Sequence, residues 1–254
     1  KYQRLDELQE KIQHFSTRVL KSDCLDLPEK VYTKRSVSLT SEQVKAYTEM
    51  KKAAITFFEE NVMTAASVLT QMIRLHQIIC GHVKTDDGEI KSIKSNRIKE
   101  LLEVLEETNG KVIIWAVYRY DIQEIERTLG EKYGKESVAT YYGDTKDNLR
   151  QSIVDRFMDA DDPLRFFVGN PKTGGYGLTL TSSHTVVYYS NDYSLEVRLQ
   201  SEDRAHRIGQ TNKVTYVDLM ADHTIDEKIV KALNAKIDLA SQVMGEDPKK
   251  ILFG

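Results

Sequence analysis

Short apolar runs alternate with helical patterns through the middle of the chain. The runs are rich in β-branched and aromatic residues and too short for buried helices, so they predict strands. Five such runs are present: KVIIWAV (111–117), SVATYYG (137–143), LRFFVGN (164–170), TVVYYSN (185–191) and VTYVDLM (214–220). Between them, apolar residues recur every three or four positions, as in Leu149, Ile153 and Phe157, which predicts helices on a sheet. This alternation predicts parallel strands with right-handed crossovers, and hence a three-layer α/β domain over residues 97–221.

The two flanking regions have a different pattern. Residues 1–96 are mostly helical in pattern and predict a linker region with insertions, in which Thr40 and Gln43 form a capping box and Gly81 ends a later helix. A short extended piece, KVYTKRSVSL (30–39), precedes these helices. Residues 222–254 predict a C-terminal helix that packs back on the domain, with Thr224 and Glu227 at its start.

Composition narrows the function classes. The 254 residues are 40% hydrophobic, and their charges nearly cancel to −3, so any anion site must be local. Two cysteines argue against a disulfide framework and fit a reducing compartment. No apolar run is long enough to cross a bilayer, which predicts no membrane partner and a cytoplasmic or nuclear location. The first residue is Lys1, so we expect a piece of a longer protein.

A glycine-rich stretch resembles a phosphate loop but lacks its chemistry. In GNPKTGGYG (169–177), Gly169 and Gly174 have the right separation, but Gly175 and Tyr176 stand where Lys and Ser/Thr are needed. No apolar strand ends in the paired acids that would hold magnesium. The chain therefore lacks the parts that hold a nucleotide alone.

Two arginines lie three residues apart near the end of the domain. If SLEVRLQSEDRAHRI (194–208) is one helix, Gln200, Arg204 and Arg207 share a face. One interpretation is a solvated face in which Asp203 pairs with Arg207. The other is an arginine finger, because planar and permanently charged guanidinium groups suit a phosphoryl group in transfer.

The stretch TGGYGLTLTSSHTVVYYSNDYSLEVRLQSEDRAHRIGQTNKV (173–214) resembles motifs V and VI of the Swi/Snf-type ATPases. These are superfamily 2 translocases on double-stranded DNA. KVIIWAV is similar to their motif IV, and RVLKSDCLDLPEKVYTKRSVSLTSEQVKAY (18–47) is similar to the segment that joins the two motor lobes. The resemblance covers essentially the whole chain and implies the second RecA-like lobe, of the P-loop NTPase type. The first lobe, which carries the phosphate loop and the magnesium-binding acids, is missing.

The resemblance also assigns roles to residues. It implies that Arg204 and Arg207 are catalytic and reach ATP phosphates across the cleft between lobes, and that Gln210 completes motif VI. The implied ATP-binding residues are Gly175, Gly177, Gln200 and Asp203. The implied DNA-binding residues are Lys172, Thr173, Gly174, Tyr118 and Arg119. The chain departs from the family after the motif IV strand, at 116–118, and at Pro171, which has no amide to donate.

The expected function is therefore the second motor lobe of an ATP-dependent translocase on double-stranded DNA. Its expected partners are double-stranded DNA and the N-terminal RecA-like lobe of the same protein. Its expected cofactors are ATP and Mg²⁺, held mainly by the N-terminal lobe. We also expect a monomer. The isolated chain is expected to be inactive. The alternative is a catalytically inactive DNA-binding or protein-docking module that retains the fold. Because residues 169–177 lack the Lys and Ser/Thr of a phosphate loop, a self-contained nucleotide-binding enzyme is disfavoured.

Two other residue sets have alternative interpretations. His76, Cys80 and His82 have the spacing of metal ligands, but a structural zinc needs four ligands and no partner pair is nearby, so we expect no metal site. Trp115 and the tyrosine pairs at 141–142 and 188–189 could stack on bases, yet they lie in predicted buried strands. Core packing is the favoured interpretation for these aromatic residues.

Overall fold

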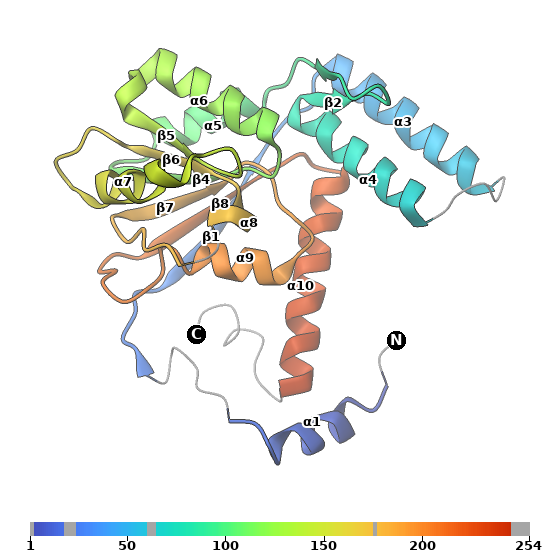
Figure 1. Cartoon of the computed structure of the whole chain (residues 1–254). Helices are drawn as coiled ribbons and strands as arrows, with labels where there is room; N and C mark the ends of the chain where they lie inside the picture. The colour runs from blue at the N-terminus through green and yellow to red at the C-terminus, as the bar shows by residue number, and fades with distance from the viewer. Residues whose placement is uncertain (1–2, 18–23, 60–64, 175–176, 245–254) are drawn as a thin grey trace.

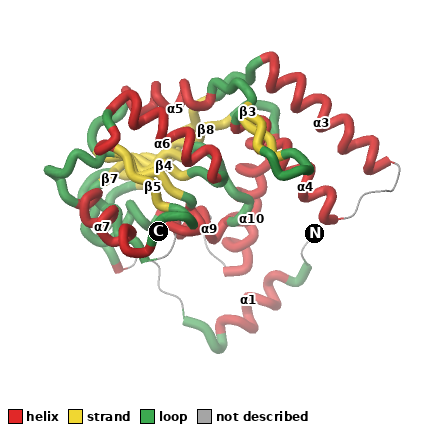
Figure 2. Tube along the Cα trace, turned by 45° about the horizontal axis from the view of Figure 1, so that its top comes forward, coloured by secondary structure: helices red, strands yellow, loops and turns green. Residues whose placement is uncertain are grey.

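A twisted parallel sheet forms the centre of the molecule, with helices on both faces (Figures 1 and 2). The computed structural model describes residues 3–17, 24–59, 65–174 and 177–244. Six strands lie in the order β1-β8-β7-β4-β6-β5, and all neighbours are parallel. Their bounds are β1 Lys30–Ser36, β4 Lys111–Trp115, β5 Val138–Tyr141, β6 Phe166–Gly169, β7 Ser183–Tyr188 and β8 Val214–Met220. The predicted α/β class and parallel sheet are confirmed.

The sheet has a separate apolar core on each face because side chains alternate along a strand. Val112 and Ile114 of β4 pack beneath α5 (Arg97–Glu106) and α6 (Arg119–Tyr133). Ile113 and Trp115 point to the opposite core, which includes Phe157 of α7 (Asp147–Met158) and Ala205 beyond α9 (Leu195–Glu202). Buried on both faces, the central strands are continuous apolar runs, as the sequence pattern indicates.

Strand β1 comes from the predicted linker region, not from the predicted domain. It pairs with β8 over its whole length, from Lys30 opposite Val214 to Ser36 opposite Met220. About 180 residues separate the two strands, and such a long-range pairing leaves no local periodic signal. The sheet therefore begins well before residue 97, and that boundary does not separate the linker from the lobe.

Two helices of the predicted linker region pack against the C-terminal helix. α3 (Ser41–Glu59) and α4 (Ala65–Cys80) form a hairpin whose inner face includes Leu75 and Ile79, in contact with Ile229 and Leu233 of α10 (Ile225–Met244). The C-terminal helix thus packs against the two helices of the predicted linker region. Figure 1 shows α10 running away from the sheet toward α1 (Leu5–Gln13).

The capping signals predicted for α3 and α4 are observed. The amide of Gln43 donates to Thr40 Oγ1, and the Gln43 side chain accepts from the Thr40 amide, which completes the capping box. Gly81 follows α4 with a φ of +103°. The remaining elements are the hairpin β2 (His82–Lys84) and β3 (Ile90–Ser92), the 3₁₀ turn η1 (Lys135–Ser137) and the short helix α8 (Pro171–Gly174). Over the described residues, no helix has the length and apolar character needed to cross a membrane.

Candidate functional site

The helix that carries the arginine motif is shorter than predicted. Ser194 caps α9 by accepting from the Val197 amide, but the helix ends at Glu202 and does not continue to residue 208. Beyond Glu202 the Arg204 amide donates to the Ser201 carbonyl, three residues earlier, and the Arg204 carbonyl accepts from the Leu180 amide at 2.9 Å, so the α-helical bonding pattern is not continued. Arg204 and Arg207 therefore lie in the turn after α9, and the prediction that helical spacing places them on one helix face is wrong.

The turn nevertheless brings the two arginines together at one acceptor. Arg204 Nη1 and Arg207 Nη1 donate to the carbonyl oxygen of Leu178, at 3.2 and 3.3 Å. Arg204 also donates from Nε to the Gln200 carbonyl at 2.8 Å. Both guanidinium groups thus bind main-chain oxygens next to the glycine-rich stretch. Tertiary contacts, and not a shared helix, bring the two arginines together.

The positive charges of Arg204 and Arg207 repel each other. Arg204 is half-buried and Arg207 is exposed. Partial burial, followed by the charge of Arg207, lowers the pKa of Arg204 from its ordinary value, while the charge of Asp203 acts in the opposite direction. An anion placed between the guanidinium groups would relieve this repulsion, so the pair is suited to a phosphate.

Gln210 holds the arginine turn in place. Its buried side chain donates from Nε2 to the carbonyl oxygens of Thr181, Ser183 and Ala205, at 3.2, 2.9 and 3.2 Å. Its Oε1 accepts from the amides of residues 211 and 212. One side chain therefore joins the loop before β7, the arginine turn and the start of β8.

The other predicted ATP-binding residues surround the same turn. Gln200 donates from its side chain to Glu196, while its main-chain carbonyl accepts from Arg204. Asp203 is the C-cap of α9. Gly177 is exposed with a φ of +74°, a conformation that favours glycine. Gly175 lies outside the described residues.

The structure places the two predicted residue groups at opposite edges of the sheet. The arginine turn and Gln210 precede β8 and contact residues at the start of β7. They therefore lie at the amino edge, the side of the sheet where the parallel strands begin. Lys172, Thr173, Tyr118 and Arg119 follow β6 and β4, at the carboxyl edge. Helix α9 runs between these edges.

The backbone amides of α8 are already bonded within the chain. The Lys172 amide donates to Asn170 Oδ1 at 2.9 Å, and the amides of Thr173 and Gly174 donate to the Asn170 carbonyl. These amides therefore already have acceptors within the chain. The Lys172 side chain is 62% exposed and pairs with Asp192 at 2.7 Å.

Gly174 is required by packing. A Cβ at Gly174 would lie 2.6 Å from two ring carbons of Trp115, which is fully buried in the core. The glycine thus allows close approach of an indole ring, not of a DNA phosphate. Its assignment as a DNA contact does not agree with this burial.

We expect Gly174→Ala to destabilise the chain. Because Trp115 has no room to move, the added methyl group should lower the free energy of unfolding by about 1–3 kcal/mol. Chemical denaturation of wild type and variant measures this change. Gly177→Ala is the matched control: nothing lies within 4 Å of its Cβ position, so its cost would come from the backbone alone. Equal stability of wild type and Gly174→Ala would contradict the packing role.

Tyr118 and Arg119 point to different surroundings. The Tyr118 hydroxyl lies 2.9 Å from His76 Nδ1, and its ring contacts His82, so it packs against α4 and β2. Burial raises the pKa of Tyr118 well above its ordinary value. Its predicted role as a DNA contact is not supported by this inward hydroxyl. Arg119 is exposed and pairs with Asp144 at 3.0 Å.

The histidines near Cys80 belong to buried polar contacts. His82 Nδ1 lies 3.0 Å from Asp121 Oδ1, and His76 Nε2 lies 3.4 Å from Asp226 Oδ1. In the part of the chain that the structure describes, no group of three or more His, Cys, Asp or Glu side chains is arranged to hold a metal ion. Of the aromatic residues expected in the core, Trp115, Tyr141, Tyr188 and Tyr189 are buried, while Tyr142 is half-buried and packs against it.

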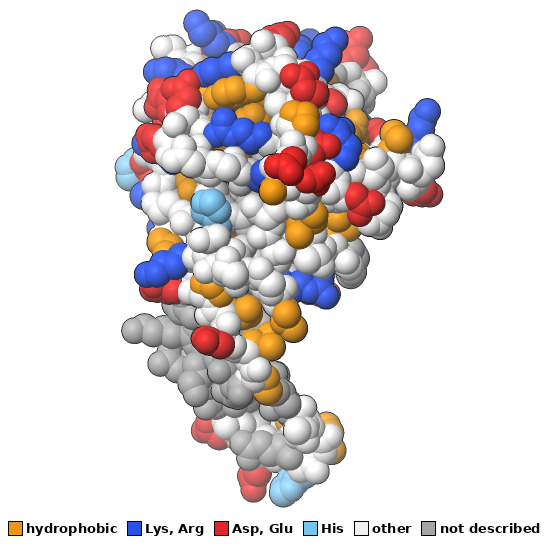
Figure 3. Space-filling model, turned by 90° about the vertical axis from the view of Figure 1, so that its left-hand side faces the viewer, with side chains coloured by type: hydrophobic (Ala, Val, Ile, Leu, Met, Phe, Trp, Pro, Cys, Tyr) orange, Lys and Arg blue, Asp and Glu red, His pale blue; other side chains and the backbone are white. Residues whose placement is uncertain are grey.

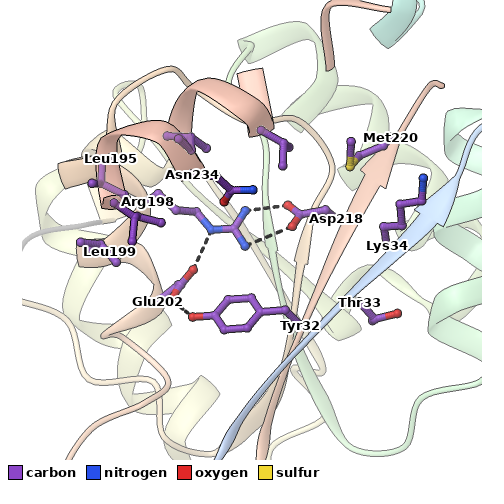
Figure 4. Close-up of a pocket in the computed structure, with 13 residues that line it drawn as sticks. Tyr32, Thr33, Lys34, Leu195, Arg198, Leu199, Glu202, Asp218, Met220 and Asn234 are labelled. Atoms are coloured by element: carbon purple, nitrogen blue, oxygen red, sulfur yellow. Dashed lines mark hydrogen bonds and ion pairs between the residues drawn. The ribbon is translucent and has the colours of Figure 1, made fainter. Parts of the chain in front are cut away.

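Sequence reasoning missed a buried ionic network on the other side of α9. Arg198 donates from Nη1 and Nη2 to Asp218, at 2.6 and 3.2 Å, and from Nε to Glu202 at 2.8 Å. Figure 4 shows these contacts with Tyr32, whose hydroxyl donates to Glu202 at 2.6 Å. Burial, followed by the Glu202 charge, raises the pKa of Tyr32 well above its ordinary value. A pocket of about 470 Å³ opens here between β1, α9, β8 and α10.

This network is structural in character. Arg198 lies 3.5 Å from the centre of the Tyr188 ring and joins α9 to β7 and β8. The sequence contained one signal of this network, the i, i+4 spacing of Arg198 and Glu202. That spacing predicts an ion pair but does not show whether the pair is buried or on the surface. The arginine turn lies outside the pocket lining.

Comparison with known proteins identifies the domain. Residues 93–209 match the sequence model of the family described as "Helicase conserved C-terminal domain". The solved structure of the Sulfolobus solfataricus SWI2/SNF2 ATPase core in complex with double-stranded DNA has a TM-score of 0.66 and 25% identity, covering 94% of this chain and 53% of that one. This part of the chain is a Swi/Snf-type helicase C-terminal domain.

The relatives of this helicase domain are larger proteins. The ATP-dependent helicase fft2 of Schizosaccharomyces pombe is 30% identical over 76% of this chain and 15% of its own length. The putative ATP-dependent helicase/translocase YwqA of Bacillus subtilis is 30% identical over 95% of this chain and 27% of its own length. The C-terminal part of the Fun30 ATPase domain matches with a TM-score of 0.68 at 17% identity, covering 82% of this chain and 90% of that one, which shows the shared fold. The chain thus spans little more than a quarter of the length of YwqA and less of fft2.

Proposed function

We propose that this chain is the second motor lobe of an ATP-dependent translocase on double-stranded DNA. In this proposal a first lobe binds ATP, and Arg204 and Arg207 reach its phosphates from the second lobe. The observation that carries the proposal is the convergence of both guanidinium groups on the Leu178 carbonyl. Two adjacent cations that share one neutral acceptor would gain most from a multiply charged anion.

The residues of this chain suit part of an ATP site. The two arginines would exchange the Leu178 oxygen for phosphate oxygens, while Gln200 and Gln210 keep the turn aligned. Bound ATP supplies the phosphoryl group that is transferred to water. Positions 175 and 176 of the sequence carry Gly and Tyr where a phosphate loop has Lys and a hydroxyl residue, so in this proposal the first lobe holds both the nucleotide and Mg²⁺. Charge stabilisation in the transition state is the contribution of the arginines.

The carboxyl edge of the sheet is the proposed DNA-facing surface. Lys172 and Arg119 are exposed cations there, and Thr173 lies beside them in α8. The Sulfolobus relative whose core was solved with double-stranded DNA supports this partner. Because α9 begins beside this edge and leads into the arginine turn, a shift of either end would be transmitted along one short rigid helix.

The proposal is tested by comparing this chain with the intact protein, in which it is joined to its first lobe. ATP hydrolysis by the intact protein should rise on addition of duplex DNA, whereas the 254-residue chain should show no turnover. Hydrolysis by the isolated chain would contradict the proposed division of the site. An intact protein that binds DNA but hydrolyses no ATP with or without it would instead support the inactive docking module.

A further inference from the structure

Lys172 and Arg119, the two exposed cations of the proposed DNA surface, each already contact an acid from a neighbouring loop. Lys172 Nζ lies 2.7 Å from Asp192 Oδ2, in the loop after β7, and Arg119 Nη2 lies 3.0 Å from Asp144 Oδ1, in the loop after β5. On the left-hand side of the molecule as drawn in Figure 1, which Figure 3 shows, acidic and basic side chains are also interspersed, with no continuous basic field. A DNA phosphate that approaches Lys172 must therefore come close to a carboxylate.

Asp192 is held more firmly than its partner. Its side chain is 21% exposed, whereas that of Lys172 is 62% exposed. Its second oxygen, Oδ1, accepts from the Ser194 amide at 2.9 Å, directly before α9. Because the lysine has a long flexible stem, its ammonium group can turn toward a phosphate while the carboxylate stays in place.

The loops around Asp192 are joined by side-chain hydrogen bonds. Asn170 donates from Nδ2 to the Val117 carbonyl at 2.8 Å, and the Val117 amide donates to Ser190 Oγ at 2.9 Å. These contacts join the loops after β4, β6 and β7 to one another. The loop that carries Asp192 is thus bonded to the loops after β4 and β6.

We propose that Asp192 is an electrostatic brake on DNA binding: it competes with the phosphodiester backbone of duplex DNA for Lys172. The brake rests on the proposed function, since it requires DNA to bind at this edge. In the free state the carboxylate neutralises Lys172, and in the bound state it repels the nearby phosphate. Both effects weaken the grip on DNA, which a translocase must release in every step.

Asp192→Asn tests the brake, because the amide keeps an oxygen for the Ser194 N–H but removes the charge. Binding of the intact protein to a fluorescein-labelled duplex is measured by anisotropy over a range of salt concentrations. The variant should bind about threefold to tenfold more tightly at low salt, and the difference should shrink as salt rises. An unchanged or weaker affinity would overturn the proposal.

A matched control separates a local effect from one of net charge. Glu29 pairs with Lys213 at 2.9 Å, and both residues are exposed at the amino edge, directly before β1 and β8. Glu29→Gln removes one negative charge there and should leave DNA affinity unchanged. If both variants bind more tightly to the same degree, net charge is the cause and the brake is rejected.

Lys172→Ala separates this proposal from the proposed function. If Lys172→Ala binds DNA as tightly as wild type, the proposed DNA contact itself fails, and the brake fails with it. If Lys172→Ala weakens binding and Asp192→Asn does not strengthen it, the DNA contact holds and the brake alone is wrong.

Discussion

Arg204→Ala should lower DNA-stimulated ATP hydrolysis by the intact protein by about a thousandfold or more, with DNA affinity kept. An arginine supplied to a phosphoryl group in transfer contributes roughly three to five decades in rate. The half-buried position of Arg204, bonded to Gln200 and Leu178, orients its guanidinium group before any nucleotide arrives. The measurement is steady-state hydrolysis with and without duplex DNA, beside duplex binding by anisotropy.

Two further variants sharpen the result. Arg204→Lys keeps the charge but not the planar fork of donors, so most of the loss should remain. Arg127→Ala is the control, because Arg127 is an exposed arginine on α6 paired with Glu124 and Glu131. It should hydrolyse ATP like wild type. If Arg204→Ala also keeps full turnover, the arginine turn is a surface feature and the proposed role is wrong.

Asp226→Asn should destabilise the fold by about 3–5 kcal/mol, because it leaves a buried arginine without its counter-ion. Arg97 is fully buried and contacts Asp226 through Nη2, while its other donors bind the carbonyl oxygens of Ile79, Tyr189 and Leu219. These contacts join α4, α5, the end of β7 and the end of β8 to the start of α10. Urea denaturation at neutral pH measures the loss.

The pH dependence of that loss has a defined sign. Burial alone would raise the pKa of Asp226, but the charge of Arg97, with contacts from His76 and the Ala221 amide, holds it well below its ordinary value. A carboxyl group whose pKa is lower in the folded than in the unfolded chain stabilises the fold at pH values above its unfolded pKa of about 4. This stability is lost as pH falls from there toward the folded pKa. The gap between wild type and Asp226→Asn should therefore narrow from pH 6 to pH 3. Asp222→Asn, at a half-buried acid of the surface that pairs with Lys34, should have a much smaller effect. A gap that is small at pH 6, or constant with pH, would contradict this account.

Local patterns in the sequence identified most of the fold. Apolar runs such as 214–220 became strands at the predicted residues, and the Thr40–Gln43 capping box formed as expected. These signals are short-range, because periodicity and capping depend on residues within one element. Residues 30–39 were expected to be extended, but their pairing as edge strand β1 was not foreseen, because the partner strand β8 lies far away in the chain.

The candidate site was predicted less completely. Motif resemblance singled out Arg204, Arg207 and Gln210, all of which meet around the loop at 178–183. Helical spacing gave the wrong reason for this meeting, since the helix ends at Glu202. Gly174 and Tyr118 were expected at DNA and instead pack against Trp115 and His76, because only the folded chain shows which side of a loop is covered.

The sequence by itself thus determined the α/β class, the order of most elements, the family and the residues of the arginine motif, since these follow from local patterns and short motifs. The tertiary structure alone decided how the arginines converge on Leu178, which acids oppose Lys172 and Arg119, and that Arg97 and Asp226 meet in the core. Each of these contacts joins residues that are distant in the chain. Their geometry depends on how whole elements pack, and a local pattern does not record it.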